Sequence, residues 1–249
     1  MGFSPRWNGD FLVLATSAAG AAFREGKPLS WSEPGLGAGI GAMRAWVEKA
    51  NASAALEDDF QFKYLFTPAY QYVASGRALF AYVDSADFFV IPEEKRASLD
   101  FRWFAAAGGE VPVSDDIVYA AMPRSGKGKQ AAEAFLKWLF REDSQRAILE
   151  RSRRTRALES SFGVAGGFSS IRSVNERAFP LYYPSLVGHM PPADAMRAPN
   201  VLPSDWPALK AAVVAPWLVE TTARKALPSN PGEELAARIE EYRKRAAQR

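Results

Sequence analysis

Residues 117–140 read I-V-Y-A-A-M-P-R-S-G-K-G-K-Q-A-A-E-A-F-L-K-W-L-F, an apolar run followed by a longer segment with helical spacing. Ile117–Met122 is a strand candidate. Apolar side chains then recur three or four positions apart over residues 128–141, which predicts a strong helix. Other short apolar runs along the chain alternate with helical segments in the same way. The sequence therefore predicts the α/β fold class.

The segments on either side of this stretch continue the alternation. Ser32 and Pro34 mark a helix start, and the apolar stripe that follows ends at Ala50. Leu79–Val83 is expected to be a buried strand, because it is a short apolar run after a glycine. Asp100–Ala105 is another strand candidate, and Phe88–Ile91 is a strand or a helix start. Further helices are expected over residues 10–23, 60–75, 143–152, 205–226 and 231–247.

Composition excludes several classes of site. The 249 residues contain no cysteine, which excludes disulfides, thiolate metal sites and cysteine nucleophiles. His189 is the single histidine, which excludes a metal site with several histidines. The net charge of +3 is too small to indicate nucleic-acid binding without a focused patch. We therefore expect no metal, no cofactor and no nucleic-acid partner.

Several short motifs have the composition of a functional motif but lack a required part. Gly35–Gly41 lacks the G-x-G-x-x-G spacing, so a glycine-rich first helical turn is expected. Ser125–Lys129 lacks the phosphate-loop pattern and is expected to be a surface loop. Arg151–Arg156 is expected to be a solvated turn, with a phosphate or nucleic-acid patch as the alternative. Gly167–Ile171 lacks the second glycine of a nucleophile elbow, so a hydrolase would have His189 as its base and no positioned nucleophile.

Three clusters combine aromatic and polar side chains in a way that suits a sugar. Carboxylates accept hydrogen bonds from hydroxyl groups, and an aromatic ring covers the apolar face of a sugar. One cluster directly follows the predicted strand Leu79–Val83, at the end of a strand where α/β sheets place ligands. The candidate ligand-binding residues of the three clusters are Trp7, Asn8, Asp10, Asp84, Ser85, Asp87 and Trp206.

Taken in order, several stretches resemble the extracellular solute-binding proteins of ABC importers, of the sugar-binding type that includes maltose-binding protein. The most specific piece is Ser125 with Ala131–Leu139 and Ser144–Gln145, which is similar to the family's S-K-N-x-x-x-A-x-x-F-L-x-W-L-x-x-x-x-x-Q passage. The other stretches that carry the resemblance are Ala19–Phe23, Leu29–Pro34, Ala42–Val47, Phe62–Tyr64, Ala74–Phe80, Ile117–Met122 and Trp206 at the head of a late helix.

The resemblance implies a periplasmic-binding-protein-like fold of type II. Two lobes with mixed sheets flanked by helices are expected, and the first lobe is incomplete because the chain looks N-terminally truncated. Residues 1–113 would form the main part of lobe two and residues 117–165 the return segment of lobe one. Residues 166–249 would form the C-terminal helices, mostly in lobe two. The ligand would bind between the lobes, and closure would pivot near residues 113–117.

The resemblance also implies a function without catalysis. The chain is expected to be the solute-binding component of an ABC importer, which binds a sugar or oligosaccharide and delivers it to a membrane permease. The expected location is periplasmic or extracytoplasmic, with the protein secreted or anchored as a lipoprotein. Two alternatives remain: a non-transport adaptor that kept the fold and lost the ligand, and a hydrolase that uses His189.

Overall fold

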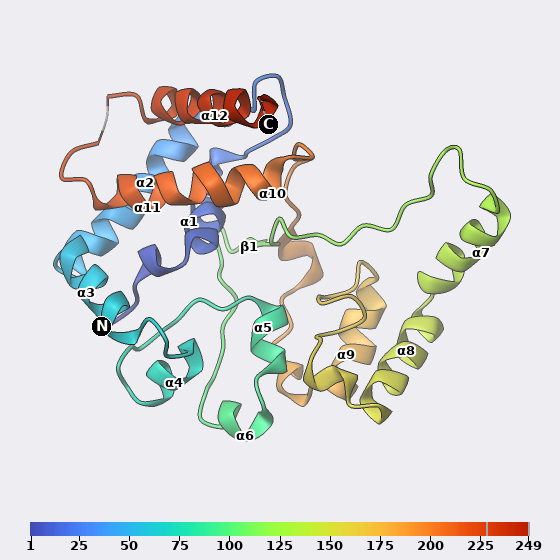
Figure 1. The fold of residues 1–249 in the computed structure, drawn as a ribbon. Helices are drawn as coiled ribbons and strands as arrows, with labels where there is room; N and C mark the ends of the chain where they lie inside the picture. Colours follow the sequence, from blue (N-terminus) through green and yellow to red (C-terminus); the bar gives the residue numbers. More distant parts are fainter. Residues whose placement is uncertain (228, 249) are drawn as a thin grey trace. The chain divides into compact units, whose positions relative to one another are not determined.

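Helices make up most of the protein. The computed structural model describes residues 1–227 and 229–248, and it is 56% helical (Figure 1). Within these residues, the only sheet pairs two short parallel strands, β1 (Val111–Pro112) and β2 (Met196–Arg197). The predicted α/β class and the two-lobed periplasmic-binding-protein-like fold are therefore wrong, because that fold requires a sheet in each lobe.

The helices vary from a single turn to 17 residues, the length of α2 and of α12. No helix in the described part of the chain is both long and apolar enough to span a bilayer. The α-helices are α1 (Gly9–Thr16), α2 (Glu33–Lys49), α3 (Ala54–Tyr64), α4 (Ala69–Ala74), α5 (Ser85–Val90), α6 (Glu93–Arg96), α7 (Lys129–Leu139), α8 (Glu142–Arg154), α9 (Phe179–Tyr182), α10 (Trp206–Leu209), α11 (Ala215–Ala223) and α12 (Pro231–Ala247).

The predicted strands do not form, because none of them has a neighbouring strand along its length. Leu79–Val83 is irregular, and Leu79 and Phe80 are 69% and 65% exposed rather than buried. Asp100–Ala105 is also irregular, whereas the apolar run at 88–91 belongs mainly to α5. Ile117–Met122 has no strand partner in the described chain. An apolar run predicts burial, but a strand forms only when a second strand exchanges hydrogen bonds with it along its length.

The chain divides into two compact units. Unit 1 comprises residues 1–82, 103–115 and 195–249, and unit 2 comprises residues 83–102 and 116–194. The division expected from the resemblance, at residues 113–117 and 165, stays a prediction. Each unit has its own core.

The core of unit 1 is built around the apolar stripe of α2. The Ser32 hydroxyl accepts a hydrogen bond from the Gly35 amide at 3.3 Å and caps the helix, as the sequence predicts. Leu36 and Ile40 are fully buried on the side of α2 that packs against α11 and α12. The other large side chains of this core are Leu12, Val13, Phe23, Leu29, Trp206, Leu209, Val213, Val214, Trp217, Leu218, Leu235 and Ile239.

The core of unit 2 is mainly aromatic. Phe89 of α5 stacks on Phe162 with ring centroids 4.6 Å apart, and Phe179 and Tyr183 pack against Phe162. The Gly163 amide donates to the Tyr183 hydroxyl at 2.8 Å, which satisfies a polar group in this apolar setting. Burial raises the pKa of Tyr183 above its usual value. Unit 2 is therefore held together by ring packing rather than by a sheet.

Candidate functional site

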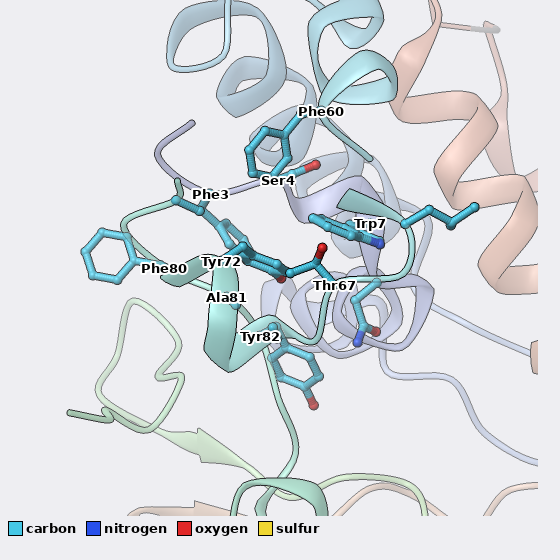
Figure 2. Close-up of a pocket in the computed structure, with 13 residues that line it drawn as sticks. Phe3, Ser4, Trp7, Phe60, Thr67, Tyr72, Phe80, Ala81 and Tyr82 are labelled. Atoms are coloured by element: carbon cyan, nitrogen blue, oxygen red, sulfur yellow. The ribbon is translucent and has the colours of Figure 1, made fainter. Parts of the chain in front are cut away.

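An aromatic pocket lies in unit 1 between the N-terminal segment and residues 60–82 (Figure 2). Its volume is about 240 Å³, slightly below the ~300–1,000 Å³ typical of sites for drug-sized ligands. The pocket is lined by Phe3, Ser4, Trp7, Asn8, Phe60, Leu65, Thr67, Ala69, Tyr72, Ala78, Phe80, Ala81 and Tyr82. It therefore suits a ligand smaller than a typical drug.

Three rings define the inner wall of the pocket. Trp7 and Tyr72 are stacked, with centroids 4.8 Å apart and planes 15° from parallel. Phe60 of α3 meets both rings edge-on, at 5.6 Å from Trp7 and 6.0 Å from Tyr72. Such offset and edge-to-face pairs stabilise one another by about 0.5–1.5 kcal/mol each beyond their burial. The wall is therefore preorganised before any ligand arrives.

The segment that carries Trp7 is anchored on both sides. Asn8 caps α1, because its side-chain oxygen accepts a hydrogen bond from the Phe11 amide at 3.0 Å. The buried Arg6 guanidinium donates to the carbonyls of Ala54 at 3.1 Å and Val219 at 3.3 Å. These contacts fix the short 3-10 turn at residues 5–7, and with it the orientation of the indole.

An acidic pair holds the other side of Arg6. Its guanidinium lies 3.0 Å from an Asp58 carboxylate oxygen and 3.9 Å from one of Glu57. The Glu57 side chain is completely buried and accepts a hydrogen bond from the Asn51 amide at 2.5 Å. Burial raises the pKa of Glu57 above 4.5, although Asn51 and Arg6 oppose that shift. These contacts tie Arg6, the residue next to Trp7, to α3, the helix that carries Phe60.

Main-chain hydrogen bonds join the first residues of the chain to residues 77–80 beside the pocket. The amides of Leu79 and Phe80 each donate to the Gly2 carbonyl at 3.0 Å. The N-terminal ammonium donates to the Arg77 carbonyl at 3.3 Å. The irregular segment at 79–82 therefore forms one wall of the pocket by pairing with the first residues of the chain.

The polar groups of the pocket are uncharged. The hydroxyls of Ser4, Thr67 and Tyr72 and the amide of Asn8 belong to the lining, and none of the described lining residues carries a formal charge at neutral pH. Burial raises the pKa of Tyr72 above 10, so its hydroxyl stays protonated. This arrangement offers hydrogen bonds without a counter-charge for an ion.

Two of the predicted ligand-binding residues, Trp7 and Asn8, line this pocket. Asp10 and Trp206 lie elsewhere in unit 1, where both connect to one polar cluster. The Lys210 ammonium lies 3.0 Å from Asp10 and 2.8 Å from Asp115, and the Trp206 indole N–H donates to Asp115. Trp206 is 3% exposed and packs against Phe23, so in this conformation neither face of the indole is open to a ligand.

The remaining predicted residues, Asp84, Ser85 and Asp87, belong to unit 2. Asp84 caps α5, since its carboxylate accepts a hydrogen bond from the Asp87 amide at 2.8 Å. Burial and the charge of Asp84 raise the pKa of Asp87. The structure gives this cluster a helix-capping role, and its part in ligand binding stays a prediction.

The single histidine lies in unit 2, with a ring nitrogen 3.9 Å from the Asp100 carboxylate and its ring 5.2 Å from that of Phe101. Neither of these two neighbours is a hydroxyl or thiol that the imidazole could activate, so the two contacts do not support the hydrolase alternative. The described residues contain no cluster of three or more acidic or histidine side chains that could hold a metal ion.

The sequence predicts only Trp7 and Asn8 among the residues that line the pocket. Phe60 and Tyr72 lie in a segment that it predicts simply as a helix, and no motif marks Ser4 or Thr67. A usable signal is the density of rings between residues 60 and 72, at Phe60, Phe62, Tyr64, Phe66, Tyr70 and Tyr72.

No family model, no curated protein and no solved structure matches the chain.

Proposed function

We propose that this protein binds a small neutral solute, of the carbohydrate class, in the aromatic pocket beside Trp7. The observation that supports this most strongly is the combination of ring walls with uncharged hydroxyl and amide groups in one cavity of about 240 Å³. A sugar offers the matching chemistry, because it has apolar C–H faces for rings and hydroxyls for polar groups. Phosphorylated or carboxylated solutes would enter without a cation to pair with.

Delivery to a permease is a separate hypothesis from solute binding. Delivery was expected to depend on hinge closure between two lobes that each contain a sheet, and the protein does not have that fold. We therefore restrict the proposed function to solute binding, and we treat transport and an extracytoplasmic location as hypotheses that rest on the sequence resemblance alone.

The test is a thermal-shift and calorimetric screen of neutral mono- and disaccharides, with uronic acids and amino sugars as charged counterparts. A bound solute stabilises the folded state by RT ln(1 + [L]/Kd), so a neutral hit should raise Tm in proportion to log concentration. Its charged counterpart should have a much smaller effect. If no solute shifts Tm, the adaptor alternative gains support and the pocket is not a sugar site.

A hit is then assigned to the pocket with matched variants. Thr67→Val removes one hydroxyl and keeps the side-chain shape, so it should weaken binding by about 0.5–1.5 kcal/mol, or two- to tenfold. Trp7→Ala should cost more, but it also disturbs the wall, so its fold is checked by circular dichroism. Trp138→Ala removes an exposed indole outside the pocket and should leave Kd unchanged. Equal losses in Thr67→Val and Trp138→Ala would place the site elsewhere.

A further inference from the structure

Unit 2 exposes an apolar segment whose backbone is unpaired. Residues 117–122 make no backbone–backbone hydrogen bond within the described chain, and Figure 1 draws them as a plain stretch leading to α7. Val118, Tyr119 and Met122 are 72%, 80% and 43% exposed. An apolar stretch with free amide and carbonyl groups is a template for pairing with another strand.

The helix that follows has the same property. No residue of α7 is buried within the described chain, yet its apolar and charged sides are clearly separated. Phe135 and Trp138 lie on one side with ring centroids 5.7 Å apart, and they are 55% and 46% exposed. Glu133 and Lys137 form an ion pair at 2.6 Å. An amphipathic helix with its apolar side exposed usually has a partner surface.

The charges at the ends of the segment favour one partner. Asp116 precedes the apolar residues, Arg124 follows Pro123, and no charge lies between the two. In a strand, residues 116, 118, 120, 122 and 124 share one face. If two copies pair antiparallel with Ala120 opposite Ala120, Asp116 of each copy faces Arg124 of the other. A parallel pair would instead place like charges opposite each other, which is destabilising.

We propose that two copies of this chain associate through antiparallel pairing of residues 116–124 about a two-fold axis at Ala120. The same surface is used by both copies, so the assembly closes as a dimer. A two-stranded ribbon is marginal alone, and the exposed apolar sides of the two α7 helices supply its cover. This proposal is independent of the solute pocket, which lies in unit 1.

Charge reversal tests the orientation. Sedimentation equilibrium of the full chain should show a monomer–dimer equilibrium. Arg124→Asp should raise the dimer dissociation constant about tenfold or more, because the variant places two pairs of like charges opposite each other across the ribbon. Asp116→Arg should do the same, and the double variant should restore dimerisation. Lys127→Asp carries the same charge change outside the paired segment and should have little effect, and melting curves check that each variant folds. A monomer at all concentrations, larger assemblies, or no rescue in the double variant would overturn the proposal.

A cysteine scan tests the register, because the sequence has no cysteine of its own. Ala120→Cys would place the two Cα atoms directly opposite, about 5.5 Å apart, within reach of a disulfide. Val118→Cys would place its two thiols about 13 Å apart along the ribbon, four residues out of step. Under mild oxidation Ala120→Cys should give a covalent dimer, and Val118→Cys should not. Equal cross-linking of the two variants would contradict the register, and so would cross-linking of Val118→Cys alone.

Discussion

Gly35 and Gly37 lie two residues apart on α2, and we expect opposite responses when each is replaced by alanine. At Gly35 a Cβ atom would overlap the carbonyl carbon and oxygen of Gly20 and the amide nitrogen of Ala21. At Gly37 a Cβ atom would meet nothing within 4 Å. The two substitutions are chemically identical and differ only in what faces them.

The magnitudes follow from two terms. Alanine is favoured over glycine in a helix interior by about 0.8–1.0 kcal/mol, so Gly37→Ala should raise the free energy of unfolding by roughly that amount. Gly35→Ala gains the same term but forces backbone atoms apart in a packed core, which typically costs about 1–3 kcal/mol and sometimes more. The overlap involves main-chain atoms that cannot rotate away, so the cost should reach the upper end. The net loss is then about 2 kcal/mol.

Urea unfolding followed by circular dichroism measures both changes as shifts in the transition midpoint, provided that the m-value is unchanged. Gly41→Ala, another position on α2 with nothing within 4 Å, is the matched control and should behave like Gly37→Ala. If Gly35→Ala were as stable as Gly37→Ala, the close approach of α2 to residues 20–21 would be refuted, and with it the packing of the unit 1 core.

Three further predictions concern buried and paired groups. Arg6→Met should cost about 3–5 kcal/mol at neutral pH, since it leaves the Glu57 carboxylate buried without its cation. Because the folded-state pKa of Glu57 is raised, its protonation favours the folded state. The loss of unfolding free energy in Arg6→Met should therefore shrink as the pH falls from 7 toward 4.5, as measured by urea titration. Two arginines lower the pKa of Glu220 to about 2, so its contribution is present above pH 4.5 and lost between 4.5 and 2. The Tm values of the parent and Glu220→Gln should therefore converge as the pH falls. About 1 M salt should also reduce the Tm difference at neutral pH, because Glu220 is half exposed. Trp206→Ala should cost about 3–5 kcal/mol in chemical denaturation, because the indole is 3% exposed in the core, and an unchanged stability would mean that it faces solvent.

The helices were the predictable part of the fold, because their signals are local. The segments expected over 128–141, 143–152 and 231–247 appear as α7, α8 and α12. The segment expected over 205–226 runs as α10 and α11, which are joined by the π-helical stretch Lys210–Val214. The segment expected over 60–75 instead divides into α3 and α4, with Pro68 as the N-cap of α4.

The strands and the site were less predictable, because both depend on distant residues. Trp7 and Trp206 each stand beside a polar residue, Asn8 and Asp205, so the sequence does not distinguish their surroundings. Trp206 is buried by Phe23, 183 positions away, and Trp7 is stacked by Tyr72, 65 positions away. Only tertiary packing separates a core aromatic residue from one that lines a pocket.

Residues 117–140 form the helix that their sequence predicts but do not bury their apolar side chains. Their pattern is that of a strand and a helix that bury apolar surface, and the helix forms while the burial does not. A helix of 11 residues is marginal in water without packing, so the apolar side of α7 needs a partner to account for its stability. Residues 117–122 and the apolar side of α7 therefore have the pattern of a buried surface while they are exposed, which points to an interface there. The charges of Asp116 and Arg124 then make a second copy the partner that fits this interface without leaving like charges opposed.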